Sequence, residues 1–466
     1  MCIIQDSPSD WETESVLMAG VYGGSFLNIG ANAASGPSSG LFQARNPLAG
    51  TPLSVNLTWR PGNLDQIPVT FFPEELGRGQ LDFSPLSTRA WVVQERILAP
   101  RTVHFLSQRV MWECRTEVLC EADPAGRLLG NDHPRRRRST VPALATLSPP
   151  PLTTVPAGES VSPSRRNEEC LRKWNSAVEL YTRANLTYQT DKLIAIAGIA
   201  KNLESMWEEN TGIHYLAGLW SYNLEQSLLW CVFSAGSGRA DPDAPSWSWA
   251  SVQGHIHTPT FSNSRPLSLM AKVLNATATP VANIFGRVQN GSGCIVIQGP
   301  MCKVTLAQQP IGGQRRRQQL IIEGQESSAE VPQIWLQNRE VEFTELKFDI
   351  LPLPSHAQGR EDVFLLGIGI EERIAGQLMP GLLLQRSTTS ASGSGSGQQG
   401  RYVRVGKWQI TDQTDPVFNS MPGRGDNFRG TNFYSLILEE FHAMGLSPGE
   451  FEGEDGEFHE YRVYIL

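Results

Sequence analysis

A long segment, residues 123–168, divides this chain and limits how it can fold. It contains four consecutive arginines, Arg135–Arg138, and three consecutive prolines, Pro149–Pro151, and it is otherwise rich in Ser, Thr and Pro. Such a composition is typical of a flexible, disordered linker. Each flanking part must therefore bury its own apolar residues. The arginine run is interpreted as solvated linker charge, with a nuclear-import patch as the alternative.

The composition of the whole chain excludes several classes of protein. The chain is 40% hydrophobic and carries a net charge of −8, so it has enough apolar residues for packed cores and no overall positive field for nucleic acid. The longest apolar run, residues 193–200, is far shorter than the roughly 18 residues of a membrane-spanning helix. Seven cysteines argue against a disulfide framework, and the N-terminus lacks the pattern of a secretory signal. These features predict a soluble cytoplasmic protein that binds neither membrane nor nucleic acid, or a nuclear one if the arginine run acts in import.

The first part, residues 1–122, begins with a pattern that predicts strand, helix and strand. The apolar run Cys2–Ile4 precedes Ser7 and Pro8, a capping residue and a proline at the first helical position. Gly23 and the glycine after it are expected to end the helix, and Ser25–Ala31 is predicted to form a short buried strand. A β–α–β unit of this kind predicts parallel pairing of its strands.

Further elements follow from periodicity and from helix-ending residues. Ser87 or Thr88 is expected to cap a helix that Pro100 ends, and Thr190 is expected to cap a later one. The elements expected before the linker are strands at 53–59 and 69–72, a helix at 89–98 and a hairpin of 102–106 with 109–114, and two helices are expected after it, between 168 and 201.

The part after the linker is expected to contain a helical segment, residues 169–260, and a β-rich domain, residues 261–466. The first ends in alternating tryptophans and serines, which predicts a strand with Trp247 and Trp249 on one face as core anchors; a binding stripe is the alternative. The β-rich domain is expected to form an antiparallel sandwich or barrel-like sheet, with a flexible loop at 387–400. Its expected strands are 294–298, 303–306, 340–350, 363–370, 382–385, 402–410, 433–439 and 461–466.

Few residues carry a recognisable chemical pattern. His255 and His257 alternate on an expected strand, but without a Cys or carboxylate partner they do not predict a metal site. On the helix at 89–98, Trp91 and Glu95 are four residues apart and share a face. Such a carboxylate beside an aromatic ring can serve glycosidic cleavage. The alternative is an amphipathic helix with Trp91 in the core and Glu95 paired to Arg89 or Arg96.

Two segments of the first part, taken together, resemble a known family. Cys2–Pro8, followed by Asp10 and Trp11, is similar to a central motif of the fungal heterokaryon incompatibility (HET) domain, and Pro85–Arg96 matches its R-x-W-x-x-Q-E motif. Segments of the later part resemble the region that follows the domain in many members: Tyr181–Ile199, Leu216–Trp220, Ala244–Val252, Phe285–Pro300 and Tyr402–Gly406.

The resemblance implies a fold and an activity. HET domains are similar to TIR domains, which have a flavodoxin-like α/β fold, so the expected class is α+β with a partial α/β domain in front. Family members normally carry further motifs before the match to Cys2, which implies an N-terminally truncated domain. Some TIR domains cleave NAD with the glutamate of a W-x-x-x-E motif. The resemblance therefore implies that Glu95 is the candidate catalytic residue and Trp91 the candidate substrate-binding residue. It also implies that NAD is the substrate and that the protein holds no cofactor or metal.

Two functions follow from this resemblance. The first is an innate-immunity effector that triggers programmed cell death after non-self recognition, acting as an NAD glycohydrolase. The second is a non-enzymatic interaction or regulatory module, which a truncated domain can still provide. The expected partners are other incompatibility or immune-receptor proteins and further copies of the chain.

Overall fold

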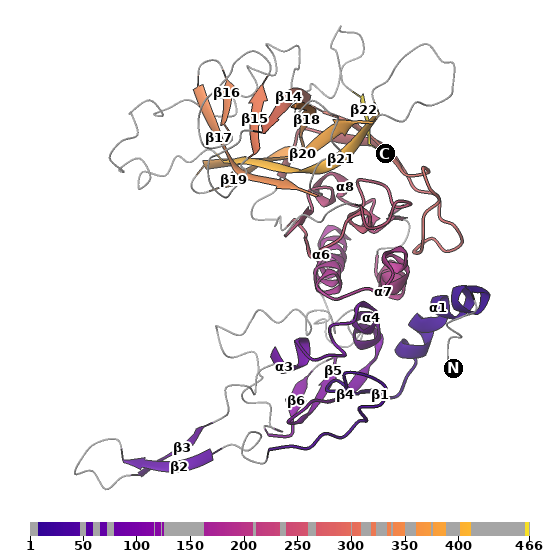
Figure 1. Cartoon of the computed structure of the whole chain (residues 1–466), viewed down its shortest axis with the longest axis vertical. Coiled ribbons are helices and arrows are strands. Elements are labelled where there is room, and N and C mark those ends of the chain that lie inside the picture. The colour runs from indigo at the N-terminus through magenta and orange to yellow at the C-terminus, as the bar shows by residue number, and fades with distance from the viewer. Residues whose placement is uncertain are drawn as a thin grey trace. The chain divides into compact units, whose positions relative to one another are not determined.

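Two compact units, residues 1–212 and 213–466, make up the chain (Figure 1). The structure is a computed structural model of the whole chain. It describes residues 8–46, 53–58, 66–71, 79–115, 117–122, 124, 163–207, 211–233, 239–259, 267–299, 301–308, 318–322, 333–336, 339–349, 360–373, 376–387, 401–411 and 462–465.

The first unit contains a four-stranded sheet with the order β1-β4-β5-β6. β1 pairs in parallel with β4, and the β4–β5 and β5–β6 pairs are antiparallel. The described strands therefore support an α+β class but do not confirm a flavodoxin-like fold, whose sheet is parallel throughout. The sheet strands are β1 (Asn28–Gly30), β4 (Arg101–Phe105), β5 (Val110–Cys114) and β6 (Val118–Cys120), and a separate antiparallel hairpin is formed by β2 (Leu53–Thr58) and β3 (Gln66–Phe71).

The expected first helix and the β4–β5 hairpin are confirmed. Helix α1 spans Pro8–Gly23, so the proline occupies the first position and the glycine ends the helix. The strand expected at Cys2–Ile4 lies outside the described residues, and the parallel partner of β1 is instead β4.

Helix α4 (Ala90–Leu98) occupies the centre of this unit. Its buried residues lie on almost every side, because α4 packs against α1, α6 (Pro163–Thr182) and α7 (Ile194–Glu204) as well as over the sheet (Figure 1). Short helix α3 (Gly79–Asp82) precedes it. Helix α6 begins at Pro163, so residues 163–168 belong to a helix and not to the expected linker; residues 125–162 of that linker lie outside the described residues.

The expected caps of α4 and α7 are wrong. Arg89 occupies the N-cap position of α4 without a side-chain hydrogen bond, and the Ala90 N–H donates to the Asn185 carbonyl at 2.9 Å. A distant loop thus supplies the acceptor that a local hydroxyl usually provides. Leu193, and not Thr190, is the N-cap residue of α7.

The second unit is built around tryptophans and a large sheet. The described strands form a twelve-stranded sheet whose pairs are antiparallel except for β21–β22. The strand expected at 363–370 is divided into two, and the strand expected at 433–439 and most of the loop 387–400 lie outside the described residues. The sheet contains β11 (Leu267–Leu269), β12 (Lys272–Thr277), β13 (Cys294–Gln298), β14 (Met301–Gln308), β15 (Gln318–Ile322), β16 (Gln333–Leu336), β17 (Arg339–Phe348), β18 (Arg360–Gly367), β19 (Gly369–Arg373), β20 (Gly376–Arg386), β21 (Arg401–Thr411) and β22 (Arg462–Ile465).

The segment expected to be a tryptophan-bearing strand is instead a tight turn. Trp249–Ser251 forms the 3₁₀ helix η3, and the Ser248 hydroxyl caps it by accepting from the Ala250 N–H. Trp247 and Trp249 are both fully buried, as expected of core anchors. The serines do not face the opposite side of a strand, because Ser248 is buried as well and donates to the Ala217 carbonyl.

The rest of this unit consists of short elements beside that turn. They are β7 (Tyr215–Leu216), β8 (Leu219–Trp220), helix α8 (Leu224–Ser227), β9 (Cys231–Val232) and β10 (Ile256–His257). Among the described residues of both units, no helix is long and apolar enough to cross a membrane.

Candidate functional site

Glu95, the candidate catalytic residue, lies half-buried on α4 and faces α1. Its carboxyl group is hydrogen-bonded to the Tyr22 side chain near the end of α1. Burial raises the pKa of Glu95 above its ordinary value, while the Tyr22 hydrogen bond and the positive charge of Arg89 oppose that rise. The pKa of the Tyr22 hydroxyl is raised too, first by burial and then by the charge of Glu95.

The ion pairs considered for Glu95 from the sequence are not among those the described residues form. Arg96 binds other carboxylates, Asp82 and Glu113. Arg89 acts on Glu95 through its charge alone, as no ion pair joins the two in the described part of the chain. Trp91 is half-buried one helical turn before Glu95, so both candidate residues share a face of α4.

The neighbouring residue Gln94 fixes the position of α4 against α7. Its side-chain oxygen accepts a hydrogen bond from the Gly198 N–H at 2.7 Å. A Cβ at residue 198 would lie 2.7 Å from that oxygen and 2.9 Å from the Cβ of Ala19, so only glycine allows this approach. Gln94 and Glu95 thus connect α4 to α7 and α1, respectively, which places the Glu95–Tyr22 pair on a fixed framework.

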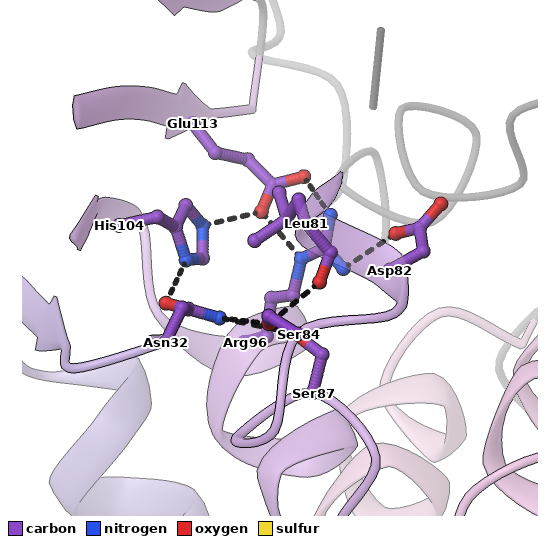
Figure 2. Close-up of polar contacts among 8 residues, drawn as sticks. All are labelled: Asn32, Leu81, Asp82, Ser84, Ser87, Arg96, His104 and Glu113. Atoms are coloured by element: carbon purple, nitrogen blue, oxygen red, sulfur yellow. Dashed lines mark hydrogen bonds and ion pairs between the residues drawn. The ribbon is translucent and has the colours of Figure 1, made fainter. Parts of the chain in front are cut away.

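A second polar cluster lies buried between α4 and the sheet (Figure 2). Arg96 of α4 binds Glu113 of β5 through two hydrogen bonds, from Nε at 2.6 Å and from Nη2 at 3.0 Å. Its Nη1 donates to Asp82 of α3 at 3.1 Å. The arginine therefore connects a helix, a strand and a short helix through charge-assisted hydrogen bonds.

His104 extends this cluster toward the end of β1. Its Nε2 lies 2.9 Å from the Glu113 carboxylate, and its Nδ1 lies 3.0 Å from the amide oxygen of Asn32. The Asn32 amide nitrogen donates to the hydroxyls of Ser84 and Ser87 at 3.0 Å each (Figure 2). Ser87, expected to cap α4, instead belongs to this buried network.

Opposing effects set the charges of this cluster. Burial lowers the pKa of His104, although the hydrogen bond to Glu113 and the negative charges of Glu113 and Asp82 favour the charged imidazolium. The nearby Arg96 and His104 hold the pKa of Glu113 at about 2 despite the cost of burial. Glu113 therefore stays ionised at neutral pH and is the centre of the cluster.

Sequence reasoning missed this cluster. Burial alternates along β4 and the turn that follows it. Thr102, His104 and Leu106 are buried, and the residues between them are more exposed. The signal available was a His and a Glu on the inner faces of two paired strands. Their arginine and asparagine partners are separated from them in sequence, so no spacing rule could find them.

The remaining candidate residues that the structure describes form no assembled metal site. The rings of His255 and His257 lie tilted to one another, with centroids 4.6 Å apart, beside the exposed Phe233. In the described part of the chain, no three His, Cys, Asp or Glu residues lie close enough to share a metal ion. Arg135–Arg138 lies outside the described residues.

Comparison with known proteins finds a family match for the N-terminal part of the first unit. The family model described as Heterokaryon incompatibility protein (HET) matches residues 1–95, a range that ends at Glu95. Among curated proteins and solved structures, nothing matches. The matched range includes both motifs of the sequence, α1 and most of α4. Residues 1–95 therefore match a heterokaryon incompatibility (HET) domain, which supports a role related to heterokaryon incompatibility.

Proposed function

We propose that this protein is an incompatibility effector that cleaves the nicotinamide–ribose bond of NAD, with Glu95 as its catalytic carboxylate. The observation that supports this proposal is the environment of Glu95, which is half-buried, bonded to Tyr22 and one turn from Trp91. Perturbed carboxyl groups of this kind are common in active sites. Loss of NAD would in turn trigger the programmed cell death of an innate immune response.

The chemistry requires an ionised carboxylate at this position. When the C1′–N bond breaks, nicotinamide leaves with the bonding electron pair as a neutral molecule, because the pyridinium was already positive. The ribose C1′ then carries an oxocarbenium-like charge, which the Glu95 carboxylate stabilises. Water adds to C1′ and releases one proton, giving ADP-ribose. Trp91 offers a flat surface against which a ring of the substrate can stack.

The test is NAD consumption by the purified full chain. Glu95→Gln keeps the shape of the side chain and removes its charge, so we expect NAD cleavage to fall by about two orders of magnitude or more. Glu117→Gln changes an exposed glutamate of the same unit and is the matched control. Equal rates for the parent and Glu95→Gln, or no cleavage by the parent at high protein concentration, would contradict the proposal.

The pH profile sharpens this test. Because burial raises the pKa of Glu95, cleavage should decline on acidification at a pH above the ordinary carboxyl range. Tyr22→Phe removes a hydrogen bond that lowers this pKa, so the acid limb should move to higher pH. An acid limb that Tyr22→Phe does not move would exclude Glu95 as the titrating group.

A second candidate function is a non-enzymatic module that associates with another copy of the chain or with a receptor protein. Strand β1 lies at the edge of its described sheet, and an edge strand can pair with another strand. Apolar side chains are exposed around it: Leu17, Val21, Phe26, Leu27 and Ile29. If this module is the function, Phe26→Ser with Ile29→Ser should lower the oligomeric mass in light scattering, and Glu95→Gln should not.

A further inference from the structure

In the described part of the chain, a third buried arginine, Arg109, differs from Arg96 and Arg404 in having no acceptor there. The residue is 1% exposed, and its Nε, Nη1 and Nη2 atoms are all inaccessible to water. None of these three nitrogens has a hydrogen-bond partner among the residues that the structure describes. A guanidinium carries five N–H donors and cannot lose its charge in a protein.

The backbone places this side chain on the buried face of the sheet. Arg109 closes the β4–β5 hairpin, because its carbonyl accepts a hydrogen bond from the Leu106 N–H at 2.9 Å. Alternation along β5 then puts Arg109 on the same face as Met111 and Glu113, which are also buried. The guanidinium therefore belongs to the row of side chains that α3 and α4 cover.

The two other buried arginines show how this protein normally satisfies such a group. Arg96 is bonded to Glu113 and Asp82, and Arg404 is bonded to Asp349. A buried charge without a partner costs several kcal/mol, more than a domain of ordinary stability readily tolerates. Arg109 in the same situation indicates that its counter-charge comes from outside the described residues.

The position of Arg109 in the sheet is one where ligands commonly bind. The parallel strands β1 and β4 both end near the β4–β5 turn, and ligands of α/β proteins bind beyond the carboxyl ends of parallel strands. The loop after β1 passes over this turn, since the Ala33 N–H donates to Phe105 and the Asn46 N–H donates to Gln108.

Glu121, a described carboxylate bonded to the residue that follows Arg109, is already engaged. Glu121 accepts from the Val110 N–H at 2.9 Å and pairs with Arg45 at 2.6 Å. It is partly exposed and has no bond to Arg109. Among the residues that the structure describes, none is therefore bonded to the buried guanidinium to compensate its positive charge.

We propose that Arg109 binds an oxyanion, a phosphate or carboxylate group of a ligand, at the β4–β5 turn. The flat fork of N–H donors matches two oxygens of either group. This site is separate from Glu95 and does not depend on NAD cleavage. Its ligand stabilises the first unit by pairing the charge that the fold leaves unpaired.

Binding of small anions to the full chain tests this proposal. Phosphate and acetate are titrated by calorimetry at constant ionic strength, with chloride as the reference anion. We expect at least one of the two to bind, and Arg109→Met to weaken that binding by tenfold or more. Phosphate alone, acetate alone or both identify the group that the site accepts. Arg101→Met, an exposed arginine at the opposite end of β4, is the matched control and should bind as the parent does.

Stability without added anion gives an independent readout. Removing an unpaired buried charge should leave the unfolding midpoint of Arg109→Met equal to or above that of the parent, whereas Arg96→Met should lower it. Arg109→Lys keeps the charge but loses the fork, so it should fold and bind the anion more weakly. The proposal fails if neither anion binds the parent more tightly than Arg109→Met. It also fails if Arg109→Met is destabilised as much as Arg96→Met, because that result would reveal an internal carboxylate partner.

Discussion

Each unit holds a buried arginine at its centre, and the two arginines are satisfied by different groups. Arg96 in the first unit is bonded to two carboxylates, one of which also contacts His104. Arg404 in the second unit is bonded to one carboxylate, that of Asp349, and to the backbone carbonyls of Leu228 and Trp230. Its guanidinium carbon also lies 3.4 Å from the centre of the Trp230 ring.

This difference gives the two clusters titrating groups whose pKa values shift in opposite directions. Backbone carbonyls and an indole ring do not change charge with pH, so Asp349 is the titrating partner of Arg404, and burial raises the pKa of its carboxyl group above the ordinary value. The Arg96 cluster depends on Glu113 and His104, whose protonation changes below neutral pH. We therefore expect the two units to respond differently to mutation and to acid.

The largest effect is expected from Arg404→Met. This change leaves Asp349 and two carbonyls buried without their donor, which should lower the free energy of unfolding of the second unit by about 4 kcal/mol. Hydrogen exchange of β20 and β21, followed by mass spectrometry, measures it. Arg287→Met removes an exposed pair with Asp243 and should cost less than about 1 kcal/mol. Similar exchange in both variants would show that Arg404 is not central.

A somewhat smaller effect is expected from Glu113→Gln in the first unit. Arg96 then keeps only Asp82, and His104 loses its carboxylate, which should cost about 3 kcal/mol. Exchange of α4 and β5 should accelerate, while β20 and β21 stay as protected as in the parent. Unchanged protection of α4 would mean that its apolar contacts alone hold it on the sheet.

Acidification should weaken the first unit by a comparable amount without any mutation. The pKa of Glu113 falls from its ordinary 4.5 to about 2 on folding, so about 3 kcal/mol of stability is present above pH 4.5 and is lost between pH 4.5 and 2. The lowered pKa of His104 adds a loss that begins as the pH falls below about 6.5, since the unfolded chain binds that proton more readily.

Denaturant titrations at several pH values, read by exchange of α4, measure this dependence. Glu113→Gln removes the carboxyl group and should flatten the curve between pH 4.5 and 2. A parent curve that is already flat in that range would refute the coupling between Glu113 and Arg96.

The smallest effect is expected from Gly198→Ala, at the contact of α7 with α4 and α1. The added Cβ would meet Gln94 at 2.7 Å and Ala19 at 2.9 Å, so the helices must separate, at a cost of about 1–2 kcal/mol. Gly20→Ala on α1 has nothing within 4 Å of its added Cβ and should be neutral or slightly stabilising. Thermal unfolding of both variants measures the difference, and equal midpoints would show that the contact is loose.

Local signals predicted the elements of the first unit more accurately than their connections. Pro8, Gly23 and Pro100 act on the backbone beside them, so the ends of α1 and α4 could be predicted. The caps could not, because Ala90 takes its acceptor from Asn185, far away in sequence. The alternation around Trp247 predicted the burial of the tryptophans correctly, but its prediction of a strand was wrong. Ser248 bonds to Ala217 and caps a 3₁₀ turn, so the backbone does not extend as a strand.

The same distinction applies to the candidate site. The sequence by itself determined that Trp91 and Glu95 share a helical face, because helical geometry is local, and its motifs identified the HET domain. Only the tertiary structure decided that Tyr22 bonds to Glu95, that Glu113 binds Arg96, and that Arg109 is buried without an acceptor among the described residues. The physical reason is that burial and partner charge arise where distant segments pack together, and no single segment encodes either.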